Sequence, residues 1–128
     1  ERLIQGREYD YVSSFMAERF YDHGTFDPAD IAVYAKAMAL PGRLRGGMEW
    51  YRTLAADHAV ALGYKKHKLQ MPVLGLGGDQ RFGAQMVPML KEFATHVTGG
   101  SIARCSHYVA DERPDEVAAA LIDFLKTR

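Results

Sequence analysis

The sequence has one cysteine, no long apolar run and no excess of either charge. Cys105 has no second cysteine to pair with, which excludes an internal disulfide and favours a reducing compartment such as the cytoplasm. No apolar segment approaches the ~18 residues of a membrane span, and no charged start followed by an apolar stretch marks a signal peptide. Sixteen basic residues balance sixteen acidic ones, so net charge does not point to nucleic acid or an anionic membrane as a partner.

Signals for a bound metal or nucleotide are also missing. The segment "GLGG", residues 75–78, is too short for the Gly-x-Gly-x-x-Gly turn of dinucleotide sites. The basic run "YKKHK", residues 64–68, makes no extended stripe for nucleic acid and predicts a solvated surface turn. Four histidines lack metal-ligand spacing with one another or with carboxylates: His23, His58, His67 and His96. We therefore expect no cofactor and no metal.

The composition is that of an ordinary soluble globular protein. Hydrophobic residues make up 48% and charged residues 25% of the 128 residues, which is enough for one domain with a real core. The chain begins with Glu1 and Arg2 rather than methionine. We expect from this that it was processed or is a piece of something longer.

The first half of the chain has the periodicity of helices. A first helix is predicted where apolar residues recur about one turn apart, at Val12, Phe15, Met16 and Phe20. A second is predicted to follow Asp27, a good N-cap residue, and to begin at Pro28. After the joint "GRLRGG", a third is predicted over roughly residues 48–62. The inner stripe of this third helix is predicted to be Tyr51, Leu54, Ala55 and His58.

The second half alternates between short apolar segments and helices. "MPVLGLGG" (71–78) and "GGSIAR" (99–104) predict buried strands. "AQMVPMLKEFATHV" (84–97) predicts a helix with Pro88 in its first turn. "RPDEVAAALIDFLKTR" (113–128) predicts a helix that begins at Pro114. Its buried stripe is predicted to be Val117, Leu121, Phe124 and Leu125.

Strand, helix, strand and helix in this order predict an α/β fold with a parallel βαβ unit and one extra helix. A parallel sheet is normally covered on both faces and has more than two strands. The expectation is therefore that this is the end of a larger α/β protein, or that a partner chain supplies the other strands. We expect one helical portion over residues 1–68 and one βαβα portion over residues 69–128.

Two residues that could do chemistry follow the predicted strands. Ligand sites in open α/β sheets lie at the carboxyl ends of the strands, where Asp79 and His107 would be neighbours. A carboxylate bound to one imidazole nitrogen fixes the tautomer, and the other nitrogen can then take a proton from water. The alternatives are a turn residue for Asp79, since "GGDQ" suits a turn, and a satisfied structural histidine for His107.

These segments resemble the C-terminal part of α/β-hydrolase-fold enzymes, in the epoxide hydrolase and haloalkane/haloacetate dehalogenase branch. The resemblance is carried by "MPVLGLGGD", by "CSHYV" and by "ERPDEVAAALIDFL". The family has a Gly-x-Gly-His-aromatic pattern after the last strand, and here His107 and Tyr108 match it. Arg104 and Ser106 stand where glycine or small residues are common. The resemblance implies that His107 activates water.

The segment "MEWYRTL", which contains Tyr51, resembles a cap-domain segment of epoxide hydrolases. The resemblance implies that Tyr51 donates a hydrogen bond to the epoxide oxygen and stabilises the alkoxide as the ring opens. Residues 1–68 would then be most of a helical cap. The alternative is that Trp50 and Tyr51 are aromatic packing on an amphipathic helix.

The family's nucleophilic aspartate and its His-Gly-x-Pro segment have no match here, and no nucleophile elbow occurs in the sequence. The resemblance implies an enzyme in which that aspartate forms an ester with a hydrophobic small molecule and His107 drives its hydrolysis. Asp79 comes one residue early for the family's Gly-x-x-Asp acid, with Gln80 in the expected place. Other members carry the acid after an earlier strand. Epoxide opening is the expected activity, and the alternatives are a dehalogenase, an inactive fragment, or a subunit that needs an N-terminal partner.

Overall fold

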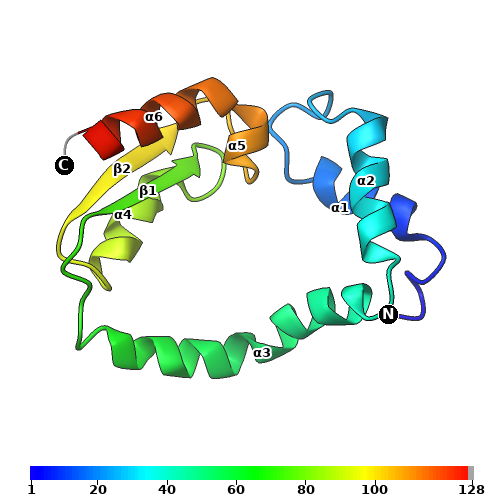
Figure 1. Ribbon diagram of the computed structural model, residues 1–128, viewed down its shortest axis with the longest axis horizontal. Helices are drawn as coiled ribbons and strands as arrows, with labels where there is room; N and C mark the ends of the chain where they lie inside the picture. The colour runs from blue at the N-terminus through cyan, green and yellow to red at the C-terminus, as the bar shows by residue number, and fades with distance from the viewer. Residues whose placement is uncertain (127–128) are drawn as a thin grey trace. The chain divides into compact units, whose positions relative to one another are not determined.

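The computed structural model describes residues 1–126. Its elements in chain order are α1 (Glu8–Ala17), α2 (Pro28–Met38), α3 (Arg43–Tyr64), β1 (Val73–Gly78), α4 (Gly83–Lys91), β2 (Val97–Ile102), α5 (Val109–Glu112) and α6 (Pro114–Lys126) (Figure 1). They form two compact units. The first contains residues 1–18 and 23–61, and the second contains residues 19–22 and residue 62 onward. The division falls within α3, whereas the sequence predicted a change after residue 68.

In the first unit, α1 packs against α2. Val12 and Met16 of α1 are buried, as their spacing predicted. The start of α2 is confirmed: the Asp27 side chain accepts a hydrogen bond of 2.8 Å from the Ala29 N–H, and Pro28 is the first helical residue. Phe20 is buried, but it lies beyond the end of α1 and belongs to the second unit. Its predicted place on the first helix is therefore wrong.

The helix α3 differs from its prediction at both ends and in its burial. It begins at Arg43, because the joint that contains Gly46 and Gly47 is itself helical. No residue of α3 is buried, and Tyr51 and Leu54 of the predicted inner stripe are 53% and 52% exposed. Helical periodicity identifies an apolar stripe but does not supply a partner to cover it.

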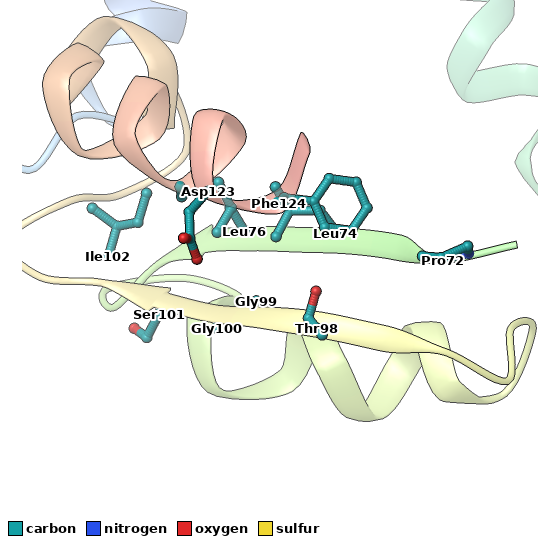
Figure 2. A pocket seen from close by; sticks show the side chains of 11 residues that line it. Pro72, Leu74, Leu76, Thr98, Gly99, Gly100, Ser101, Ile102, Asp123 and Phe124 are labelled. Carbon is teal, nitrogen blue, oxygen red and sulfur yellow. The ribbon is translucent and has the colours of Figure 1, made fainter. Parts of the chain in front are cut away.

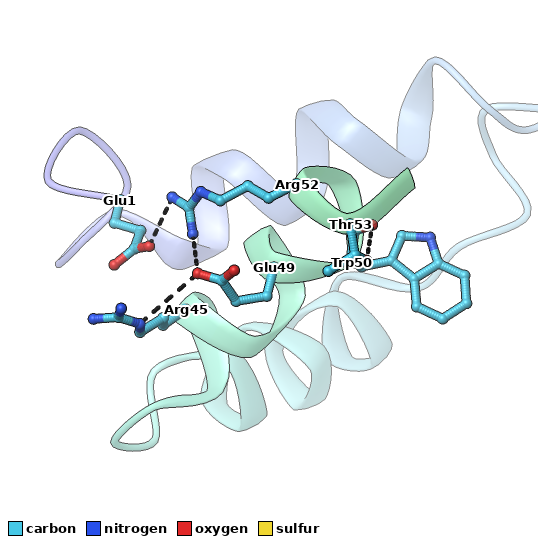
Figure 3. Close-up of polar contacts among 6 residues, drawn as sticks. All are labelled: Glu1, Arg45, Glu49, Trp50, Arg52 and Thr53. Atoms are coloured by element: carbon cyan, nitrogen blue, oxygen red, sulfur yellow. Dashed lines mark hydrogen bonds and ion pairs between the residues drawn. The ribbon is translucent and has the colours of Figure 1, made fainter. Parts of the chain in front are cut away.

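The exposed surface of α3 carries several ion pairs. The Arg52 guanidinium lies between the Glu49 carboxylate and the Glu1 carboxylate, with a distance of 3.0 Å to Glu1 (Figure 3). Arg45 pairs with Glu49 one turn away at 3.9 Å. Exposed ion pairs of this kind contribute little to stability. The conformation of α3 therefore depends mainly on its own backbone hydrogen bonds.

The second unit contains the predicted parallel βαβ arrangement. Strands β1 and β2 pair in parallel, in a register that runs from Val73 beside Val97 to Gly78 beside Ile102. The crossover helix α4 packs against both strands, and α6 lies on the opposite face (Figure 2). Strand β2 begins at Val97, which the sequence placed in the preceding helix. Pairing with β1 explains this extension, because it supplies hydrogen bonds that the sequence alone does not reveal.

Pro88 also departs from its prediction. It lies inside α4 rather than in the first turn, since the helix begins at Gly83. Proline has no N–H, so the helix lacks the hydrogen bond that residue 88 would otherwise donate to the Ala84 carbonyl. The helix continues to Lys91, only three residues further.

The helix α6 begins at Pro114 as predicted but covers the sheet incompletely. None of its residues is buried, and Leu121 and Leu125 of the predicted stripe are 45% and 64% exposed. Between α6 and the strands lies a groove of about 660 Å³ (Figure 2). It is lined mainly by apolar residues and glycines, among them Leu74, Leu76, Gly99, Ile102 and Phe124. The face of the sheet towards α6 is therefore only partly covered by the described chain.

Candidate active site

The loop between β2 and α5 carries His107 at the carboxyl ends of the two strands. The exposed His107 follows two buried residues, Cys105 and Ser106. A small pocket of about 120 Å³ lies beside it and is lined by Gly78, Arg81, Phe82, Met86, His107 and others. The structure confirms that His107 and Asp79 follow neighbouring parallel strands. The carboxyl ends of these strands form the edge at which open α/β sheets bind their ligands.

The buried carboxylate of Glu112 holds this loop from behind. Glu112 is 4% exposed, and its Oε1 accepts hydrogen bonds from the backbone N–H groups of Ser106 and Tyr108, at 3.0 and 3.2 Å. Its Oε2 accepts from the backbone N–H of Tyr21 at 2.7 Å. Sequence reasoning did not single out Glu112. Two signals were available: Glu112 lies between the candidate histidine and a proline-started helix, and it is the first residue of "ERPDEVAAALIDFL", a segment that carries the resemblance.

Residues 19–22 form the other support of the loop. The His107 backbone N–H donates to the Arg19 carbonyl at 3.1 Å. The Phe20 ring stacks on Tyr108 with a centroid distance of 4.8 Å, and the His107 ring meets the Tyr108 ring edge-on at 5.0 Å. These contacts explain why a segment between α1 and α2 belongs to the second unit.

The side chain of Asp79 contacts the main chain of the loop. Its carboxylate accepts hydrogen bonds from the N–H groups of Arg104 at 3.0 Å and Cys105 at 3.1 Å. These bonds lower the pKa of Asp79, because they stabilise the charged carboxylate. Within residues 1–126 no hydrogen bond joins this carboxylate to His107. The observed contacts are those of a turn residue, and the role of acid partner stays a prediction.

Asp79 also helps to explain a departure from the resembled pattern. Arg104 adopts a left-handed backbone conformation with φ of 50°. Glycine is favoured in such a conformation because a Cβ is crowded there. The hydrogen bond from the Arg104 N–H to Asp79 stabilises this turn without a glycine.

Cys105 is a packing residue of this loop. It is fully buried, and burial, together with the nearby Glu112 carboxylate, raises its pKa to about 11. The thiolate is the nucleophilic form of cysteine, so a thiol of this kind is a poor nucleophile at neutral pH. Among the residues that the structure describes, no group of three or more His, Cys, Asp or Glu side chains could hold a metal ion.

Tyr51 lies on α3 in the first unit, whereas His107 and Asp79 lie in the second. Tyr51 and Trp50 are 53% and 72% exposed. Within the first unit, therefore, neither residue is buried by the aromatic packing on the helix that was the alternative interpretation. The role of Tyr51 towards a substrate stays a prediction.

No helix in the described part of the chain is both long and apolar enough to cross a membrane.

No protein-family model matches the sequence. A soluble epoxide hydrolase from Corynebacterium sp. (strain C12) is 32% identical over 116 residues, which are 89% of this chain and 40% of that protein.

Solved structures are also similar to this chain over part of their length. The ligand-free epoxide hydrolase CorEH matches with a TM-score of 0.87 and 32% identity, over 99% of this chain and 46% of that one. Wild-type Cfl2 from Burkholderia cenocepacia also matches with a TM-score of 0.87 and 32% identity, over 97% of this chain and 42% of that one. The chain has the fold of the C-terminal portion of an α/β hydrolase, and it spans less than half the length of the relatives it matches.

Proposed function

We propose that this chain supplies the water-activating histidine and most of the cap of an epoxide-hydrolase-like α/β hydrolase. The observation that carries the proposal is the place of His107. It follows the last strand of a chain similar to epoxide hydrolases, in a loop whose backbone is held on both sides by hydrogen bonds to the buried Glu112 carboxylate. A general base needs such a fixed position to reach its water.

In the proposed reaction, an aspartate outside this chain attacks one epoxide carbon, and the C–O bond to the ring oxygen breaks. Tyr51 donates its phenolic proton to the alkoxide that forms, which leaves a hydroxyalkyl ester on the aspartate. His107 then takes a proton from water, and the resulting hydroxide attacks the ester carbonyl. The ester collapses to a diol and a free carboxylate, and the proton that His107 holds returns through water to the Tyr51 phenolate, which restores both side chains. Asp79, or a carboxylate after an earlier strand, orients the imidazole and stabilises its charged form.

The proposal includes an N-terminal remainder that carries the nucleophile and the other strands. Three observations support it: a sheet of two described strands, the groove beside α6 and the exposed apolar surface of α3. The exposed aromatic rings of α3 suit a hydrophobic small-molecule substrate. The single buried cysteine suits a cytoplasmic location.

The first test compares a styrene-oxide-like epoxide with a haloacetate on the assembled enzyme, meaning this chain together with the segment that supplies the nucleophile. We expect diol from the epoxide. We expect a His107→Gln variant to stall as a covalent ester, which adds the mass of the epoxide to the protein. General bases typically contribute 10²–10⁴-fold, so diol release should fall by about that factor.

The matched control is His96→Gln, an exposed histidine of the same unit, which should leave diol release unchanged. Halide release without epoxide opening would replace the proposed activity with that of a dehalogenase. A chain that turns over neither substrate and purifies without an N-terminal segment would mean that it is not an enzyme as it stands.

A further inference from the structure

We propose that Glu112 is a positioning residue for His107, and that it couples the His107 loop to residues 19–22. The inference rests on the proposed function, because it assigns a role in the water-activation step. Glu112 does not lie among the residues that line the pocket beside His107. It acts through the main chain of the residues on either side of the histidine.

The geometry is that of a clamp. A single oxygen, Oε1, receives the N–H groups of Ser106 and Tyr108, the two neighbours of His107 in the sequence. Both amides must therefore point to the same buried atom. This requirement restrains the backbone before and after His107, and with it the direction in which the imidazole leaves the chain.

The second oxygen extends the clamp to another part of the sequence. Oε2 receives the N–H of Tyr21, while the His107 N–H donates to the Arg19 carbonyl. The segment 19–22 and the loop are thus joined by two hydrogen bonds and by the stack of Phe20 on Tyr108. A change in the position of this segment would be transmitted to the backbone of His107.

The clamp requires a carboxylate and not merely a polar side chain. A carboxylate offers acceptors at both oxygens, and both are used here by backbone donors. A glutamine has nearly the same shape but carries an NH₂ in place of one oxygen. That donor would face either the Tyr21 N–H or the pair from Ser106 and Tyr108. Glu112→Gln therefore removes one arm of the clamp with almost no change in volume.

The test separates the two chemical steps in the assembled enzyme. In Glu112→Gln, we expect ester hydrolysis to slow by roughly tenfold to a hundredfold, the range that follows from a small misplacement of a catalytic group. The rate of ester formation, and with it kcat/KM, should change less than twofold, because His107 does not act in that step. The control is Glu116→Gln, an exposed carboxylate in the first turn of α6, which should match the wild type in both steps.

A purely structural role for Glu112 would lower the fraction of active protein and so reduce both steps equally. Equal losses, or no loss in the hydrolysis step, would overturn the inference. Glu112→Asp keeps the charge on a shorter side chain and should fall between wild type and Glu112→Gln. It also keeps the test decisive if the glutamine variant fails to fold.

Hydrogen exchange provides a readout that needs no turnover. The amides of Tyr21, Ser106 and Tyr108 should all be protected in the wild-type protein. In Glu112→Gln the amides of the lost arm, either that of Tyr21 or those of Ser106 and Tyr108, should exchange at least tenfold faster. Unchanged exchange would overturn the clamp, whatever the activity. If His107→Gln does not stall ester hydrolysis, the proposed function fails. If His107→Gln stalls hydrolysis and Glu112→Gln does not, only the role of Glu112 fails.

Discussion

The loop around His107 and the helix around Tyr51 carry the two most specific sequence signals, and the chain supports them very differently. His107 is exposed, but buried groups hold the backbone on both sides of it. Tyr51 is on a helix with no buried residue, where the side-chain contacts are exposed ion pairs. The chain itself therefore determines the position of the histidine. For the tyrosine it determines only the position along α3.

Gly78→Ala is the change expected to break this comparison most strongly. A Cβ at Gly78 would lie 2.1 Å from the Ser106 carbonyl oxygen and 2.4 Å from that of Cys105. Backbone atoms cannot rotate away as a flexible side chain can, so the loop of His107 must shift. We expect the free energy of unfolding to fall by about 3 kcal/mol or more, measured by urea denaturation.

The matched control for this substitution is Gly46→Ala in α3. No atom lies within 4 Å of the added Cβ, and alanine favours a helix over glycine. This variant should gain about 0.5–1 kcal/mol. A Gly78→Ala variant as stable as wild type would show that the loop is no more constrained than the helix.

The reactivity of Cys105 tests how firmly the loop of His107 is held. Because burial raises its pKa to about 11, only a small fraction of the thiol is ionised at pH 8. We expect an aromatic disulfide reagent to modify the folded protein on the order of a hundredfold more slowly than the urea-unfolded chain. The absorbance of the released thiolate measures both rates. Equal rates would mean that the loop opens readily and that the buried support of His107 is weak.

Asp79→Asn should have the smallest effect of these predictions. The substitution should lower the stability of the fold by an amount that depends on pH. The backbone hydrogen bonds from Arg104 and Cys105 lower the pKa of Asp79 in the folded state. The ionised carboxylate therefore stabilises the fold above the pKa of an unfolded aspartate, about 4. That stabilisation is lost as the pH falls through the lower folded pKa.

Wild type should accordingly be more stable than Asp79→Asn at pH 7, and the difference should vanish in acid. Denaturation curves at pH 7 and at a series of acidic values measure this difference. A gap that persists below the folded pKa would mean that Asp79 supports the turn by shape and not by charge. An identical stability at pH 7 would mean that the turn after β2 does not need it.

Local signals predicted much of the fold. Asp27 and Pro28 marked the start of α2, and Pro114 marked the start of α6, because capping and proline act on neighbouring backbone groups. Glycines and short apolar runs identified the two strands. The burial of α3 was predicted wrongly, because an apolar stripe does not show what covers it. The extension of β2 back to Val97 was missed because it depends on pairing with a distant strand.

The amino-acid sequence by itself determined the order of strands and helices except for the short helix α5, the place of His107 after the last strand and the resemblance to an α/β hydrolase. These features depend on periodicity, turn residues and short motifs, all of which are local. Only the tertiary structure revealed Glu112 as the support of the His107 loop and residues 19–22 as part of the second unit. Glu112 and Tyr21 are 91 residues apart, and no local pattern links a buried carboxylate to so distant a backbone donor.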